Sequence, residues 1–212
     1  MTTHIRIYSD YICPFCYIGK GILDRLAQEF DIAAEWLPFE IHPETPPGGA
    51  LLTEHLPHID WDDLYRNLRS AGKEYGIVFG RVRMLPNSRM ALEASEYARD
   101  HGAHGALHEA LFRAYFTDLQ DIGNRAVLLD IARSVGLDPG GLEAALDAGT
   151  YRDRLDQTQR AARRRDITAV PAFIINDCCS IVGAQPLPLF RETLGRIAQP
   201  RTAHRPAERD SR

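Results

Sequence analysis

Apolar residues recur with strand spacing at the two ends of the chain and with helical spacing between them. A short apolar run at 5–9 predicts a first strand, and the amphipathic stretch 14–30 predicts a helix. Residues 32–39, again largely apolar, predict a second strand. A strand, a helix and a strand in this order are typical of a βαβ unit. The proline- and glycine-rich stretch 44–50 predicts a loop at which an insertion can begin.

From residue 60 to about residue 166 the apolar spacing is helical throughout and predicts five or six helices. Their starts are marked by residues that cap helices well. These are Asp60, Asn87 or Ser88, Asn124, Asp138 before Pro139, and Thr150, which forms a capping-box pattern with Asp153. Since no strand pattern interrupts this region, it predicts an all-helical insertion.

A β-hairpin is predicted after the insertion. Residues 172–175 and 180–183 have strand character and flank a turn at Asn176-Asp177. A final helix is expected over 186–198. The fold class is therefore α/β, with a central mixed sheet. Its domain organisation is an N-terminal part at 1–59, the insertion at 60–150 and a C-terminal part at 151–199, while 200–212 is expected to be a disordered tail.

The candidate chemistry lies where the first strand meets the first helix, at Cys13-Pro14-Phe15-Cys16. Two thiols three residues apart on a first helical turn are close enough to form one disulfide. Cys13 is expected to be the N-cap, with Pro14 at the first helical position. The positive end of the helix dipole then favours the thiolate of Cys13. We expect Cys13 to be the exposed nucleophile and Cys16 to be the resolving thiol.

Composition narrows the class of protein. The 212 residues carry a net charge of −4, which argues against a nucleic-acid partner. No apolar run is long enough for a membrane span. The first strand begins almost at Met1, where a signal peptide would need an apolar stretch. We therefore expect a cytoplasmic protein, whose cysteines are kept reduced.

Four motifs together resemble the thioredoxin fold as built in the DsbA family, and most closely its FrnE-like branch. They are Ser9-Asp10 to Tyr17-Ile18-Gly19, Asn87 to Ala94, Val170-Pro171-Ala172-Phe173, and Val182-Gly183-Ala184-Gln185-Pro186. This branch is related to 2-hydroxychromene-2-carboxylate isomerases and kappa-class glutathione transferases. The resemblance implies a cis Val170–Pro171 bond lying against the redox pair. It also implies that the Val170 backbone pairs with an extended client.

Four positions near the cysteine motif bear on the chemistry of the site or on which member of this group the chain resembles. Phe15 stands where Trp is commoner, so the dipeptide between the cysteines is apolar. The related isomerases and transferases typically have Ser in place of the first cysteine, whereas this chain has Cys13. His42 stands where an Asn is common, in the loop after the second strand; it can relay protons, bind a substrate anion or simply be solvated. Asp10 can take the proton of Cys16 or cap nearby N–H groups.

The remaining cysteines, Cys178 and Cys179, are adjacent. A disulfide between neighbouring residues is strained, so free thiols at the hairpin tip are the favoured interpretation. A second redox pair and a crosslink between chains are the alternatives. No metal site is expected, because adjacent cysteines chelate one tetrahedral ion poorly.

The sequence thus predicts a disulfide oxidoreductase with Cys13 and Cys16 as catalytic residues. The expected substrate-binding residues are Pro14, Phe15, Val170, Pro171 and His42. No cofactor is expected beyond the redox-active disulfide, with glutathione as a candidate redox partner. The partners are protein or small-molecule thiols and disulfides, and a homodimer is compatible with the sequence. The alternatives are a glutathione-dependent isomerase or transferase acting on a small aromatic, and a chaperone that uses only its apolar cleft.

Overall fold

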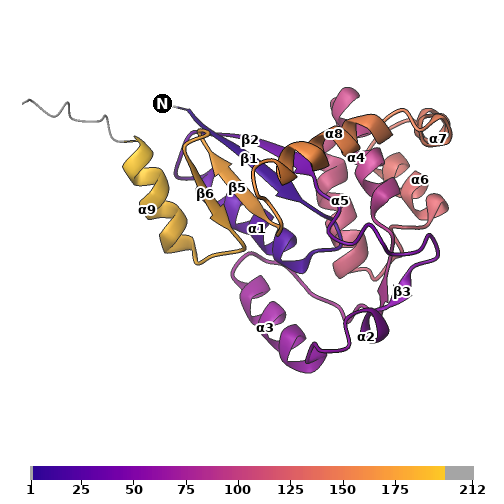
Figure 1. Cartoon of the computed structure of the whole chain (residues 1–212), viewed down its shortest axis with the longest axis horizontal. Helices are drawn as coiled ribbons and strands as arrows, with labels where there is room; N and C mark the ends of the chain where they lie inside the picture. The colour runs from indigo at the N-terminus through magenta and orange to yellow at the C-terminus, as the bar shows by residue number, and fades with distance from the viewer. Residues whose placement is uncertain (1, 199–212) are drawn as a thin grey trace, which may run out of the picture.

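A four-stranded mixed sheet organises the computed structural model, which describes residues 2–198. Its strands are β1 (Thr3–Ser9), β2 (Ile32–Pro38), β5 (Ala172–Ile175) and β6 (Cys179–Val182), in the order β2-β1-β5-β6 (Figure 1). β1 runs parallel to β2 and antiparallel to β5, and β6 is antiparallel to β5. The predicted α/β class with a mixed sheet is confirmed.

Two helices belong directly to this sheet. Helix α1 (Pro14–Leu26) connects β1 to β2, which confirms the βαβ unit, although it ends before the predicted residue 30. Helix α9 (Leu187–Ala198) follows β6 and lies at the left of Figure 1. The turn between β5 and β6 contains Asn176 and Asp177, both with positive φ, as short polar turn residues tolerate.

Six helices follow one another in the middle of the chain. They are α3 (Trp61–Lys73), α4 (Arg89–Asp100), α5 (His104–Phe116), α6 (Arg125–Ser134), α7 (Pro139–Ala148) and α8 (Arg152–Arg163). The side chains of Asp60, Asn124 and Asp138 accept amide hydrogen bonds at the starts of α3, α6 and α7, which confirms these three caps. Helices α4 to α7 gather on the right of Figure 1, while α3 lies below α1.

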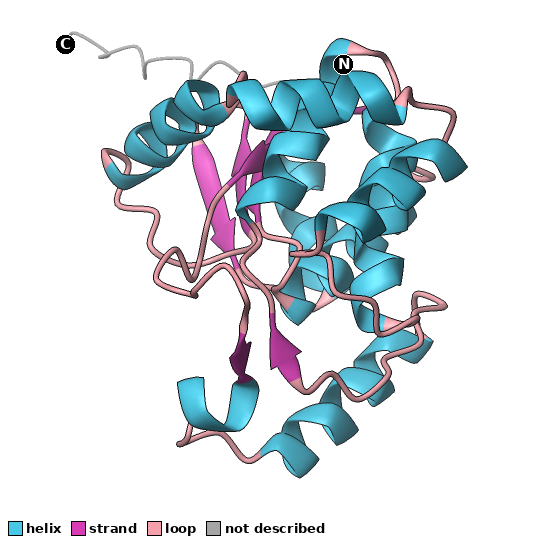
Figure 2. Ribbon diagram, turned by 90° about the vertical axis from the view of Figure 1, so that its right-hand side faces the viewer, coloured by secondary structure: helices cyan, strands magenta, loops and turns pink. Residues whose placement is uncertain are grey.

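The sequence predicted an all-helical insertion at 60–150, and this is wrong at one point, because strand β4 (Met84–Leu85) lies within it. β4 pairs antiparallel with β3 (Ala50–Leu51), which precedes the insertion and is followed by the short helix α2 (Leu52–His55). Both strands stand below the main sheet in Figure 2. Two-residue strands are too short to produce an alternating pattern, so the pairing leaves no trace in the sequence.

The predicted capping box at Thr150 is wrong. Helix α8 begins at Arg152, with Tyr151 as its N-cap and no side-chain cap. The N–H of Thr150 instead donates to the carbonyl of Ala145, because Gly149 ends α7 in the left-handed conformation. Thr150 therefore belongs to the end of one helix and not to the start of the next.

The insertion packs onto the helix that carries the cysteines. Tyr17 of α1 stacks on Phe112 of α5 with ring centroids 5.1 Å apart, and Phe112 is fully buried. One continuous apolar core thus joins the sheet to the helical region. The predicted tail at 200–212 lies outside the described residues. Within residues 2–198 no helix has the length and apolar character that crossing a membrane requires.

Candidate active site

The two predicted redox cysteines lie at the start of α1. Cys13 is the N-cap residue with an extended backbone, and Pro14 takes the first helical position. The N–H of Cys16 donates to the carbonyl of Cys13 at 3.0 Å, which closes the first turn. All four cysteines are free thiols in the described chain. The geometry is therefore that of the reduced pair, with Cys13 at the positive end of the helix dipole.

Both thiols of the motif are buried, whereas the sequence predicted that Cys13 would be exposed. Cys13 is only 6% exposed and Cys16 is fully buried. The expectation of an exposed Cys13 is wrong, because the Val170 segment and the walls of the cavity described below cover it. Phe15 is the exposed residue of the motif, at 44%. A substrate must reach Cys13 through the cavity beside it.

Cys16 is held in its protonated form. Burial raises its pKa well above the ordinary value of a thiol, and the neighbouring Cys13 thiol adds to the shift. A protonated thiol is a poor nucleophile. Cys16 therefore needs a base to remove its proton before it can attack a disulfide.

The Val170–Pro171 segment lies against the cysteines. Its peptide bond is cis, the isomer that the resemblance implies, and the thiol of Cys13 donates to the carbonyl of Val170 at 3.5 Å. Helix α1 approaches this segment closely at Gly19, where a Cβ atom would lie 3.2 Å from Cγ of Pro171 and 3.0 Å from the ring of Phe173. The structure thus places the Val170–Pro171 segment beside Cys13, as the resemblance implies.

An apolar cavity of about 280 Å³ opens beside Cys13. It is lined by the predicted residues Cys13, Pro14, Phe15 and His42. Its other walls come from α2, α3 and α5, among them Leu52, Leu56, Trp61, Leu64, Tyr65 and Phe116. Val170 and Pro171 are not among the lining residues, so the Val170 carbonyl contacts Cys13 from outside this cavity.

Trp61 is the lining residue that the sequence gave no reason to single out for binding. It is the first residue of α3. Its indole N–H is buried, and it has no hydrogen-bond partner among the described residues. A buried donor without a partner is uncommon and costs about 1–3 kcal/mol. Because this N–H is closed to solvent, the cavity presents the ring of Trp61 and not its N–H.

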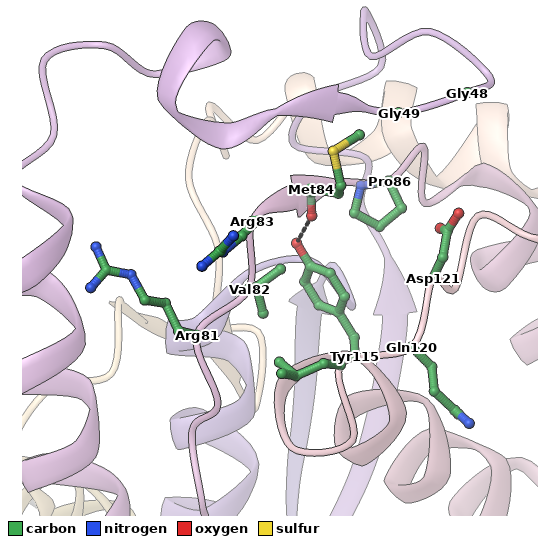
Figure 3. A pocket seen from close by; sticks show the side chains of 11 residues that line it. Gly48, Gly49, Arg81, Val82, Arg83, Met84, Pro86, Tyr115, Gln120 and Asp121 are labelled. Atoms are coloured by element: carbon green, nitrogen blue, oxygen red, sulfur yellow. Dashed lines mark hydrogen bonds between the residues drawn. The ribbon is translucent and has the colours of Figure 1, made fainter.

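A second cavity, of about 340 Å³, is separate from the cysteines. Tyr115 lines both cavities, and its hydroxyl donates to the carbonyl of Met84 (Figure 3). The lining of this second cavity includes Arg81 and Arg83 but none of the predicted site residues. We therefore locate the candidate active site in the first cavity.

Asp10 is the buried carboxyl next to the motif. It accepts hydrogen bonds from the N–H of Ile41 at 2.8 Å, the hydroxyl of Ser88 at 3.1 Å and the N–H of Ile12 at 3.3 Å. Burial, only partly offset by these bonds, raises the pKa of Asp10 to about 7. Asp10 can therefore take up or release a proton near neutral pH, and it also joins three segments of the chain. Both roles considered from the sequence are compatible with this geometry.

The contact with Asp10 explains the unusual start of α4. Ser88 is the N-cap of that helix, yet its side chain makes no capping hydrogen bond, because its hydroxyl donates to Asp10 instead. The neighbouring Arg89 forms ion pairs with Glu40 at 2.8 Å and Asp156 at 2.6 Å. The motif at 87–94 thus positions the loops around the active site.

His42 lies at the rim of the cavity. Its Nδ1 atom is 2.9 Å from a carboxylate oxygen of Glu44, and its side chain is 23% exposed. The carboxylate holds the imidazole in one orientation. His42 is therefore placed where a substrate would enter.

Cys178 and Cys179 lie at the end of the hairpin, as predicted. Their sulfur atoms are 3.8 Å apart and are not bonded to each other. The favoured interpretation of free thiols is therefore confirmed in this structure. The register places Cys179 opposite Ile175, at the end of β5 remote from Pro171, so these two thiols are not part of the site at Cys13.

Comparisons with known proteins agree with this architecture. The chain is 32% identical over 197 residues to the Bacillus subtilis (strain 168) protein named Uncharacterized protein YwbO, covering 92% of this chain and 96% of that protein. The structure of the present chain is similar to that of the probable DsbA oxidoreductase SCO1869 from Streptomyces coelicolor. The TM-score is 0.84 at 24% sequence identity, and the match covers 92% of the present chain and 89% of the other.

A third similarity is to a 2-hydroxychromene-2-carboxylate isomerase, with a TM-score of 0.75, 19% identity and coverage of 92% and 95%. At such identities the two solved structures show a shared fold. The profile of the DSBA-like thioredoxin domain matches residues 4–195, which is nearly the whole chain. With the cysteine motif at the start of α1 and the mixed sheet beside it, this match shows that the chain belongs to the DSBA-like thioredoxin domain family.

Proposed function

We propose that this protein is a thiol–disulfide oxidoreductase that uses Cys13 and Cys16 as its redox pair. The observation that carries the proposal is the position of Cys13. Cys13 is the N-cap residue of α1, its thiol donates to the carbonyl of Val170, and it lines an apolar cavity. Such an arrangement combines a nucleophile, a main-chain surface for a peptide and a pocket for a side chain.

The reaction follows from the two different environments of the thiols. The Cys13 thiolate attacks a client disulfide, so that a Cys13–client bond forms and the client's second sulfur leaves and takes up a proton. Cys16 then loses its proton and attacks the Cys13 sulfur. This step forms the Cys13–Cys16 disulfide and releases the client sulfur that was bonded to Cys13, which leaves as a thiol. The client gains the two electrons that the pair loses, and the reverse sequence oxidises a dithiol client.

Asp10 is the candidate acceptor of the Cys16 proton. Its backbone N–H interacts with the Cys16 sulfur in the direction that favours the thiolate. Its carboxyl has a pKa of about 7, so it is partly ionised at neutral pH. Proton transfer by a positioned side chain typically contributes a factor of about 10²–10⁴ to a rate.

The walls of the cavity support a preference for apolar or aromatic groups next to the disulfide. Phe15, Leu52 and the ring of Trp61 offer apolar contact surface. His42 lies at the entrance. Protein or small-molecule disulfides can both meet these requirements, and glutathione is a candidate redox partner. The cytoplasmic location and a homodimer stay predictions.

Replacing each cysteine by serine tests the proposal. Cys13→Ser should abolish turnover of a disulfide substrate, whereas Cys16→Ser should accumulate a mixed disulfide at Cys13, visible by mass spectrometry as an added glutathione. Cys178→Ser is the matched control, because it removes a thiol outside the site. If Cys13→Ser kept full activity, the assignment of the nucleophile would be wrong.

A glutathione-dependent isomerase acting on a small aromatic is the second candidate. The structural similarity to a 2-hydroxychromene-2-carboxylate isomerase and the apolar cavity favour considering it. In that case the glutathione sulfur would lie near Cys13, with the aromatic against Trp61. Turnover of a chromene-type substrate with no exchange of disulfides would support this candidate. A chaperone without redox chemistry would instead keep its function in the double variant of Cys13 and Cys16.

A further inference from the structure

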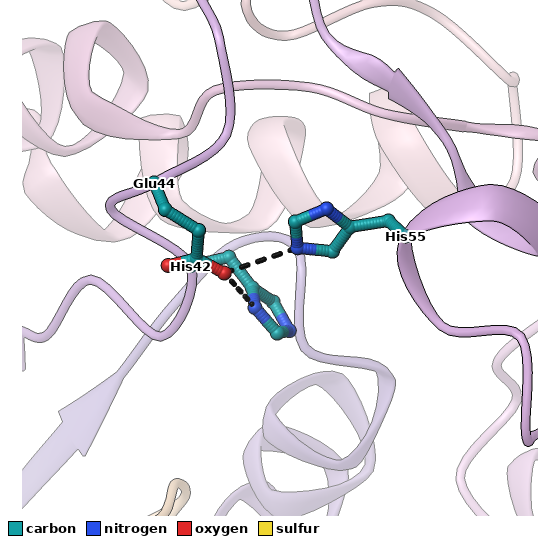
Figure 4. A group of neighbouring side chains, drawn as sticks. All are labelled: His42, Glu44 and His55. Carbon is teal, nitrogen blue, oxygen red and sulfur yellow. Dashed lines mark hydrogen bonds and ion pairs between the residues drawn. The ribbon is translucent and has the colours of Figure 1, made fainter.

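Two histidines and a glutamate converge at the rim of the cavity. His42 Nδ1 and His55 Nε2 lie 2.9 Å and 3.0 Å from the same oxygen of Glu44 (Figure 4). The three donor atoms all lie within 4.8 Å of one another. The side chains of His42 and His55 are 23% and 20% exposed, so the group can be reached from solvent.

The backbone fixes this arrangement from both sides. The N–H of Thr45 donates to the carbonyl of His42 at 3.1 Å, which turns the loop so that His42 and Glu44 face the same point. The side chain of Asn87 donates to the carbonyl of Thr45 at 2.7 Å and anchors the loop to the start of α4. His55 is the last residue of α2. The group therefore joins two segments whose positions are determined elsewhere in the fold.

The chemistry of the three side chains suits a divalent transition metal. Two imidazoles and one carboxylate are a donor set used by zinc sites that keep a fourth position open. Zinc bonds of about 2.0–2.1 Å in a tetrahedron place neighbouring ligand atoms about 3.3 Å apart. The separations of 2.9 Å and 3.0 Å are within half an ångström of that spacing. Small side-chain movements would therefore admit an ion.

We propose that His42, Glu44 and His55 bind a divalent transition-metal ion, with zinc as the first candidate. The three residues occupy three positions and leave the fourth for water or an incoming ligand. Since His42 lines the same cavity as Cys13, the ion lies at the entrance to the redox site. It also ties α2 to the loop after β2 and so holds Leu52 and Leu56 in the cavity wall. The site does not depend on redox chemistry at Cys13.

The test is metal binding by the purified full-length chain, reduced, stripped of metal and free of any purification tag. Zinc binding is measured by calorimetry, and cobalt is used as a spectroscopic probe of the ligands. We expect one high-affinity equivalent, and affinity at least about tenfold weaker in each of His42→Ala, His55→Ala and Glu44→Gln. His58→Ala is the matched control, since His58 is exposed on the same segment and should bind as the unmodified chain does.

Cobalt separates this site from the thiols. Binding at His42, Glu44 and His55 gives visible ligand-field bands without a sulfur-to-cobalt charge-transfer band, and the spectrum persists in Cys13→Ser. A charge-transfer band that disappears in Cys13→Ser would overturn the proposal, because it would place the ion on the cysteines. Unchanged zinc affinity in the folded His55→Ala and Glu44→Gln variants would overturn it too, and would leave hydrogen bonds as the only role of the group.

Discussion

Asp10 offers a quantitative test of how the active site is built. The carboxyl is fully buried, and its pKa is raised to about 7, chiefly by that burial. The substitution Asp10→Asn replaces it with a group of the same shape that cannot ionise. The amide oxygen can still accept from Ile41 and Ser88, whereas the amide NH₂ cannot accept from the N–H of Ile12.

The raised pKa makes stability depend on pH. Unfolded Asp has a pKa of about 3.9, so between about pH 4 and pH 7 the folded chain holds a proton that the unfolded chain has lost. The contribution of Asp10 to stability is therefore fully present below pH 4 and is lost as the pH rises through 7. Because one pKa unit corresponds to about 1.4 kcal/mol, the ionised carboxylate destabilises the fold by about 4 kcal/mol relative to its protonated form.

Asp10→Asn should remove most of this dependence. At pH 8 we expect the variant to be more stable than the unmodified chain by about 3 kcal/mol, after a loss of about 1 kcal/mol for the bond to Ile12. At pH 5 the unfolded carboxyl has already lost its proton, which costs the unmodified chain about 1.5 of the about 4 kcal/mol, so the advantage of the variant should shrink to about 0.5 kcal/mol. The difference between the two proteins should therefore grow by about 2.5 kcal/mol from pH 5 to pH 8.

The measurement is urea unfolding of both proteins from pH 5 to pH 8, with the cysteines kept reduced. Burial also lowers the pKa of His104 and His108, but both histidines are present in both proteins and cancel in the difference. The surface variant Asp153→Asn is the control and should give a constant difference. Parallel stability curves for Asp10→Asn and the unmodified chain would refute the reasoning, because they would mean that Asp10 does not titrate in this range.

Three further predictions address the surroundings of the site. Gly19→Ala should lower the unfolding free energy by about 1–2 kcal/mol, because the added Cβ would crowd Phe173 and Pro171. The matched control is Gly195→Ala in α9, where the added Cβ meets open space; it should raise the unfolding free energy by about 0.5–1 kcal/mol in the same urea assay. Trp61→Phe removes a buried N–H that has no partner among the described residues, so the gain from removing it, about 1–3 kcal/mol, should offset most of the loss from the smaller ring; a loss above about 3 kcal/mol in the urea assay would argue that the N–H has a partner. Replacing both Cys178 and Cys179 by serine should leave disulfide turnover unchanged, and a large loss would indicate a second redox pair.

Local sequence patterns determined much of this fold. The apolar runs at β1, β2 and β5, and the caps of α3, α6 and α7, were predicted from neighbouring residues. The position of Cys13 at the start of a helix was predicted in the same way. Helix and strand periodicity, capping and turn formation act over a few residues, so the chain carries these signals within short windows.

The tertiary structure alone decided what surrounds the sulfur atoms. Asp10 meets Ser88 across 78 positions of the chain. The cavity walls come from α3 and α5, which the sequence placed only in an insertion, and from α2, which it did not predict. The burial of Cys13, the pairing of β3 with β4 and the meeting of His42 with His55 likewise depend on how that insertion packs over α1. Contacts between distant segments follow from the packing of whole elements, which no short stretch of sequence encodes. The residues of the chemistry were therefore predicted locally, whereas their burial, charge state and access to substrate come from the packing of the helical region on the sheet.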